Sequence, residues 1–118
     1  MSEVPDSHIY VRIYDKKYKP HLVIKIGRTS QPLKRDKAYA RNYTIKTKYH
    51  NISTKKFLRR VAGTHEKSMK NICLRHHGKS FNANKDPRPD REWFEFSNVK
   101  DYIEALKELD NFITEKNE

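Results

Sequence analysis

The sequence predicts a small α/β domain whose short, mainly antiparallel sheet is flanked by helices. Two segments near the N-terminus, 8–14 and 21–26, have the alternation and the β-branched residues of strands. The polar connection between them is short, which favours an antiparallel hairpin. Apolar residues recur at helical spacing over 99–113. The 118 residues include seven tyrosines, five phenylalanines and one tryptophan, so the chain can build one modest core.

The first predicted strand, 8–14, alternates aliphatic residues with polar and aromatic ones, so it is expected to be half-buried. Tyr10 then lies on the face opposite the aliphatic one, and Lys25 of the second strand joins it there. Residues 1–7 are expected to be a disordered lead, which leaves 8–118 as a single domain.

A turn and a helix are predicted to follow the second strand. Gly27 is expected to allow the turn, and Thr29 or Ser30 to cap a helix that spans 32–42. This geometry would bring Arg35 back beside the end of the strand. Backbone N–H groups and a guanidinium that point to one place suit a phosphate, although an ordinary strand–helix junction in a basic protein explains the same residues.

The remaining chain is predicted to contain two more strands, two more helices and one long loop. These assignments rest on β-branched and aromatic runs, on apolar residues at helical spacing, and on glycine and proline in the loop. They are a strand at 44–52, a helix that begins near 53–54 and ends at Gly78, a loop at 76–91, a short strand at 92–96, and a final helix capped by Ser97 or Asn98.

The net charge of +11 indicates an anionic partner, most simply nucleic acid. The charge is uneven, because the segment from residue 98 onward carries −3 and the rest carries +14, most densely over 34–60. Cys73 is the single cysteine, so the chain has no intramolecular disulfide and suits a reducing, intracellular compartment. No apolar run reaches membrane-spanning length, and we expect a monomer or weak dimer with no membrane partner.

The tripeptides at 8–10 (HIY) and 25–27 (KIG) together resemble the paired motif of the GIY-YIG nuclease superfamily. The KIG form, followed late in the chain by EWF at 92–94, is similar to a phage and large-DNA-virus subgroup that also occurs in meiotically up-regulated fungal proteins. The resemblance covers about residues 8–97. His8 and Lys25 depart from it, because the family has glycine and tyrosine there.

The resemblance implies a GIY-YIG-like fold and a metal-dependent endonuclease, with DNA favoured over RNA. Tyr10 would activate or orient the attacking water, Arg35 would hold the scissile phosphate, and Glu66 would bind Mg²⁺ or Mn²⁺. Tyr39 would orient water or phosphate. A free tyrosine has a pKa of about 10 and is a poor base, so Lys25 and Arg35 are expected to lower the pKa of Tyr10.

Exposed cations are expected to contact the backbone of the nucleic acid, with tyrosines at 43 and 49 available for stacking. Phosphate contacts carry no sequence information, and nothing in the chain resembles a helix-turn-helix or a zinc finger. The predicted binding residues are Arg28, Lys34, Lys37, Arg41, Lys46, Lys48, Lys55, Lys56, Arg59 and Arg60.

Each assigned residue also has a simpler interpretation. Tyr10 and Lys25 would be ordinary strand residues, the lysine protecting a sheet edge from aggregation, and Glu66 would only complement Lys70 at i,i+4. The departures at His8 and Lys25 favour a rival function, a catalytically inactive nucleic-acid-binding module. A third alternative is an adaptor that binds a partner through the acidic final helix.

Overall fold

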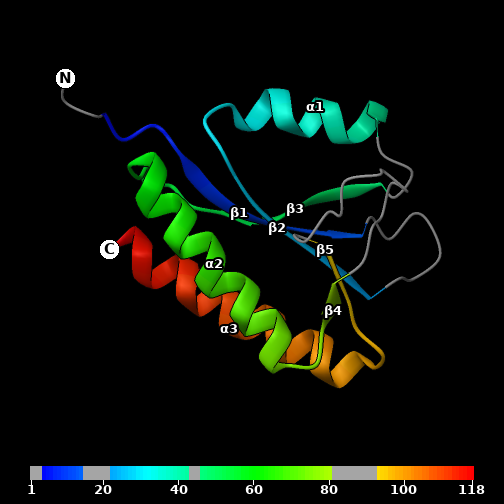
Figure 1. Cartoon of the computed structure of the whole chain (residues 1–118). Helices are drawn as coiled ribbons and strands as arrows, with labels where there is room; N and C mark the ends of the chain where they lie inside the picture. The colour runs from blue at the N-terminus through cyan, green and yellow to red at the C-terminus, as the bar shows by residue number, and fades with distance from the viewer. Residues whose placement is uncertain (1–3, 15–21, 43–45, 81–92) are drawn as a thin grey trace.

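The structure, a computed structural model, describes residues 4–14, 22–42, 46–80 and 93–118. Within these ranges five strands form one antiparallel sheet in the order β3-β1-β2-β5-β4, and three helices pack on it (Figure 1). The predicted fold class is confirmed. In chain order the elements are β1 His8–Tyr14, β2 Val23–Thr29, α1 Pro32–Asn42, β3 Thr47–Ile52, α2 Arg59–Arg75, β4 Lys79–Ser80, β5 Trp93–Glu95 and α3 Val99–Asn117.

Helices cover both faces of the sheet. In Figure 1, α1 lies on one face, and α2 and α3 pack against each other on the opposite face. The hydrophobic core lies between the sheet and the α2–α3 pair, and it includes the buried Cys73, whose thiol pKa burial raises to about 12. Its aliphatic members include Ile9, Val11, Ile24 and Ile26 of the sheet and Met69, Ile72, Leu109 and Ile113 of the helices.

The β1–β2 register confirms that Tyr10 and Lys25 share a face. Tyr10 pairs with Gly27, and Arg12 pairs with Lys25, so all four lie on one face of the sheet. Tyr10 and Arg12 contact Tyr39 and Asp36 of α1, which covers this face. The expectation of a half-buried first strand is wrong, because every residue from 9 to 13 is buried. Alternation in the sequence suggested a solvent-facing side, and α1 covers that side instead.

The second helix begins at Arg59, several residues later than predicted. Residues 53–58 make other contacts: the Ile9 N–H donates to the Ser53 hydroxyl (3.0 Å), which itself donates to the Lys55 carbonyl (2.9 Å). Phe57 pairs with Ser7 in an isolated antiparallel bridge. These contacts hold residues 53–58 against Ser7 and Ile9 in a bent, non-helical course, which delays the start of the helix.

The region predicted as a loop at 76–91 begins with ordered structure. His77 has φ 69°, the left-handed conformation typical of a residue just past a helix C-terminus, and the Gly78 N–H donates to the Cys73 carbonyl (2.8 Å). The short strand β4 then pairs with β5. The rest of that predicted loop, the first residue of the EWF motif at 92 and the tyrosine at 43 lie outside the described residues.

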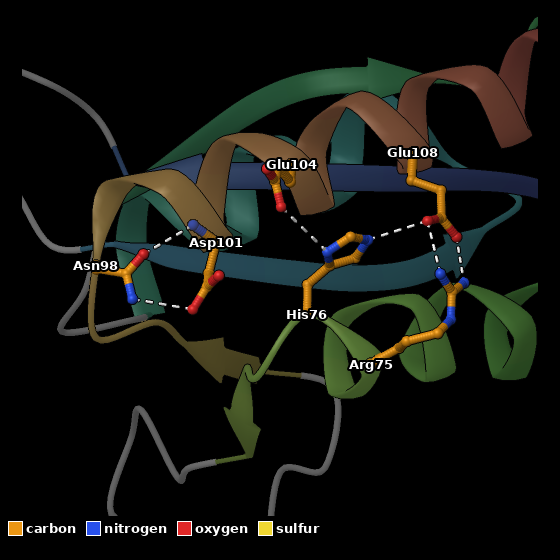
Figure 2. A network of polar contacts seen from close by, with 6 residues as sticks. All are labelled: Arg75, His76, Asn98, Asp101, Glu104 and Glu108. Atoms are coloured by element: carbon orange, nitrogen blue, oxygen red, sulfur yellow. Dashed lines mark hydrogen bonds and ion pairs between the residues drawn. The ribbon is translucent and has the colours of Figure 1, made fainter.

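The acidic helix α3 is tied to α2 by a polar network (Figure 2). Arg75 donates to both carboxylate oxygens of Glu108, one of them at 2.7 Å. His76 lies between the two helices, with Nε2 at 3.0 Å from Glu108 and Nδ1 at 4.0 Å from Glu104. Asp110 of α3 also makes a contact within the domain, since its Oδ2 atom is 3.0 Å from Nε2 of His50 in β3. These acidic residues are engaged within the domain, which weakens the adaptor hypothesis for α3.

We expect Glu108 to make the stability of the domain depend on pH. Hydrogen bonds from Arg75 and then from His76 lower the pKa of Glu108 from its ordinary 4.5 to about 2. Because the folded pKa lies below the unfolded one, the stabilisation is fully present above about pH 4.5 and is lost as the pH falls toward 2. Urea unfolding at pH 7, 4.5 and 3 should show Glu108→Gln losing less stability on acidification than wild type. Glu115→Gln, an exposed residue of the same helix, should keep the wild-type slope, and equal slopes in all three proteins would contradict the assignment.

Candidate nucleic-acid site

Three of the predicted catalytic residues lie together beneath α1. Tyr10 of β1, Lys25 of β2 and Tyr39 of α1 are 2%, 3% and 1% exposed. The hydroxyls of Tyr10 and Tyr39 are 3.3 Å apart and share a hydrogen bond. The Lys25 ammonium lies 5.6 Å from the centre of the Trp93 ring, and Tyr39 packs against the same ring. The sequence motifs therefore converge on one buried aromatic and basic cluster.

Gly27 lies inside β2, so the expectation that it forms the turn is wrong. No glycine in the described ranges has a positive φ. A Cβ placed on Gly27 would be 2.2 Å from the hydroxyl oxygen of Tyr10 and 2.3 Å from its Cζ. Glycine is therefore required because the Tyr10 ring crosses directly over the backbone of β2.

The expected lowering of the pKa of Tyr10 is also wrong in sign. Burial and the neighbouring Tyr39 raise this pKa well above 10, while Lys25 and Arg35 lower it by less. The charges of Lys25 and Arg35 do not offset the free-energy cost of removing the Tyr10 phenolate from water. At neutral pH the Tyr10 hydroxyl is therefore protonated and can donate a hydrogen bond.

Arg12 is a site residue that sequence reasoning missed. It is 0% exposed, and its guanidinium lies 4.4 Å from the centres of both the Tyr39 and Tyr49 rings. It pairs with Asp36 of α1 at 2.8 Å and donates from Nε to the Thr47 hydroxyl at 2.8 Å. Arg12 thus clamps α1 to β1 and β3. The available signal was its place in the alternation, two residues after Tyr10.

A cavity of about 630 Å³ opens where β2 passes into α1, beside the start of α2. The turn comes at residues 30–31, where the Thr29 hydroxyl accepts the Gln31 N–H (3.0 Å) and the Gln31 carbonyl accepts the first helical bond from Arg35 (3.0 Å). Arg35 lines the cavity, which agrees with its predicted position beside the end of the strand. The lining residues are Arg28, Lys34, Arg35 and Arg59, with Asp6, Ser7, Thr29, Ser30, Gln31 and Ala38.

Glu66 lies on α2, on the face of the sheet opposite the tyrosine pair (Figure 1). Its carboxylate is near two cations: Lys70 Nζ is 3.3 Å from Oε1, and Arg28 Nε is 3.9 Å from Oε2. Arg28 also lines the cavity, so one side chain separates Glu66 from that space. The structure thus brings Arg35 and Arg28 together at the cavity, and it places Glu66 behind Arg28.

The other predicted binding cations fall into three groups. Lys46 donates from Nζ to the Ala40 carbonyl (2.9 Å), so it caps the C-terminal end of α1. Lys34 and Arg59 line the cavity. The rest are exposed and do not line it: Lys37, Arg41, Lys48, Lys55, Lys56 and Arg60. His8, the departure from the first motif, donates from Nδ1 to the Ser53 carbonyl at 2.7 Å and joins β1 to the end of β3.

The described residues contain no group of three or more His, Cys, Asp or Glu side chains that could hold a metal ion. Glu66 remains the carboxylate to which the resemblance assigns a metal. Mg²⁺ commonly binds one or two carboxylates and takes its other oxygens from water and substrate phosphates. A buried glutamate one side chain away from a cation-lined cavity fits such a minimal site, with the phosphate arriving as part of the substrate.

In the described part of the chain, no helix has the length and the apolar character to cross a membrane. A family model, the T5orf172 domain, matches residues 7–114. No functionally curated protein matches the chain significantly, and no solved structure does so either. The matched range covers the sheet, α1, α2, most of α3 and every residue that lines the cavity except Asp6. The chain therefore belongs to the T5orf172 domain family, which is associated with nuclease-like phage proteins and indicates a nuclease-like or DNA-binding module.

Proposed function

We propose that this domain is a metal-dependent endonuclease of the GIY-YIG type that hydrolyses phosphodiester bonds in nucleic acid, with DNA favoured over RNA. The observation that carries the proposal is the cavity at the end of β2, where Arg28, Lys34, Arg35 and Arg59 meet. Four cations around one polar space suit the phosphates of a nucleic-acid backbone. Membership of a nuclease-associated family supports the same conclusion.

The residues around the cavity can be given roles that agree with their environments. Arg35 would bind the scissile phosphate and offset the charge that grows on it in the transition state. A divalent ion such as Mg²⁺ or Mn²⁺ on Glu66 would supply Lewis-acid stabilisation of the same phosphate. Because the pKa of Tyr10 is raised, its hydroxyl stays protonated and is not suited to abstract a proton. We assign it instead the role of orienting the Tyr39 hydroxyl through their shared hydrogen bond. Lys25 lies beside this pair and against the Trp93 ring, where its charge partly offsets the rise in the pKa of Tyr10.

Nicking of supercoiled plasmid in Mg²⁺ or Mn²⁺ tests this proposal. We expect Glu66→Gln and Arg35→Ala each to slow nicking by at least about 100-fold, since each removes charge stabilisation of the transition state. Glu115→Gln and Lys107→Ala change the same kinds of charge at exposed positions of α3 and should nick like wild type. Equal nicking by all five proteins would indicate a contaminant and would sink the assignment of roles.

The burial of Tyr10 and Glu66 favours one alternative, a nucleic-acid-binding module without catalysis. Tyr10 is 2% exposed and Glu66 is 7% exposed, so neither is openly presented to a substrate. A binding module predicts DNA affinity that falls steeply with salt, together with no metal-dependent nicking of plasmid or branched DNA. In that case Arg35→Ala would weaken binding and Glu66→Gln would not.

A further inference from the structure

Arg28 crosses one face of α2 on its way to the cavity. Residues 59, 63 and 66 of α2 lie on a common helix face. Arg28 contacts all three positions: its NH1 group donates to the Arg59 carbonyl at 2.9 Å, and its Nε is 3.9 Å from Glu66. A Cβ on Gly63 would be 2.5 Å from the same NH1 nitrogen. Glycine at this point of the helix therefore leaves room for the guanidinium.

Arg28 and Glu66 differ in their access to solvent. The Arg28 side chain is 41% exposed and lines the cavity, whereas the Glu66 side chain is 10% exposed. At 3.9 Å the contact between them is an ion pair without a short hydrogen bond, so it costs little to separate. Arg28 can therefore turn toward an anion in the cavity at little cost. Glu66 does not line the cavity, and Arg28 lies between the two.

We propose that Arg28 is a positioning residue that couples anion binding in the cavity to cation binding at Glu66. With the cavity empty, Arg28 neutralises the Glu66 carboxylate and competes with a metal ion for it. A phosphate in the cavity attracts the Arg28 guanidinium and leaves the carboxylate oxygen to the metal. This inference rests on the proposed metal site at Glu66, and it makes the site bind metal more tightly when the substrate phosphate is present.

The coupling must be reciprocal, because both ligands act on the position of the same side chain. The expected change in metal affinity on removal of Arg28 also has the opposite sign to the change that a purely phosphate-binding role would give. Removing an arginine that only binds phosphate would leave metal affinity unchanged or lower it. Removing Arg28 should instead raise metal affinity, since a competing positive charge leaves Glu66.

Mn²⁺ titration followed by electron paramagnetic resonance tests the proposal without relying on activity. Sulfate serves as the tetrahedral anion, against chloride at equal ionic strength. In wild type we expect sulfate to tighten Mn²⁺ binding about two- to fivefold, the range set by a partly exposed ion pair. Arg28→Ala should bind Mn²⁺ more tightly than wild type in chloride, by a similar factor, and should gain little from sulfate.

Lys70→Ala is the matched control, because Lys70 also faces Glu66 but does not line the cavity. This variant should bind Mn²⁺ more tightly in chloride and still respond to sulfate. Gly63→Ala gives a second route, since its methyl group would push the guanidinium aside while Arg28 keeps its charge; it too should bind Mn²⁺ more tightly in chloride.

The outcomes separate this inference from the proposed function. If Glu66→Gln abolishes Mn²⁺ binding while Arg28→Ala and Gly63→Ala bind no more tightly than wild type, the coupling is wrong and the metal site stands. Persistent Mn²⁺ binding by Glu66→Gln would remove the metal site and the coupling together.

Discussion

Gly27→Ala is expected to destabilise the domain by about 1–3 kcal/mol and to abolish cleavage. The added methyl carbon would overlap both the hydroxyl and Cζ of Tyr10, at 2.2 and 2.3 Å. Tyr10 cannot yield easily, because it is 2% exposed and its ring also contacts Tyr49 edge-on at 5.4 Å. Relief would therefore require moving β1 away from β2 or displacing the ring from its hydrogen bond with Tyr39. Chemical denaturation and the plasmid assay measure the two effects.

Gly63→Ala is the matched control for this prediction. Its methyl group meets the end of a flexible and partly exposed arginine, and alanine favours the helix over glycine by up to about 1 kcal/mol. We expect its stability to equal or exceed that of wild type. In a Tyr10→Ala background, Gly27→Ala should cost little, because the overlapping ring is gone. A full cost in that background would show that glycine is needed for another reason.

Arg12→Ala should lower the free energy of unfolding by about 2–4 kcal/mol, because it empties a fully buried site in the sheet and removes an ion pair whose Asp36 partner is half exposed. The change removes the pair with Asp36 and the bond to Thr47, and it leaves a gap between the rings of Tyr39 and Tyr49. Since α1 carries Arg35 and Tyr39, loosening this clamp should also reduce nucleic-acid binding. Urea denaturation and a binding titration are the measurements.

Arg12→Lys keeps the charge but loses the planar group that stacks between two rings, so it should recover only part of the lost stability. It also gives a folded reference if the alanine variant does not fold. Arg41→Ala removes an exposed arginine from the same helix and should change stability by no more than about 0.5 kcal/mol. A loss below about 1 kcal/mol for Arg12→Ala would show that α1 is held by other contacts.

Local patterns in the sequence determined much of this fold. The hairpin of β1 and β2, the bounds of α1 and the cap of α3 by Asn98 were all predicted from neighbouring residues, and the Asn98 side chain does accept the Asp101 N–H at 2.9 Å. Periodicity also placed Tyr10 and Lys25 on one face. These features depend on neighbouring residues or on consecutive segments of the chain, so the order of residues along the sequence is enough to predict them.

Tertiary structure decided the electrostatics and the close contacts of the site. The burial of β1 on both faces, and with it the raised pKa of Tyr10, depends on α1 covering a side that alternation marks as polar. Gly27 looked like a turn residue, and only the path of the Tyr10 ring shows why a side chain is excluded there. The contact of Arg28 with Glu66 joins residues 38 positions apart, each of which looks like a solvated charge in the sequence. Desolvation and ion pairing depend on which elements, distant in the sequence, come into contact. The sequence pattern of one element does not indicate which other element it packs against.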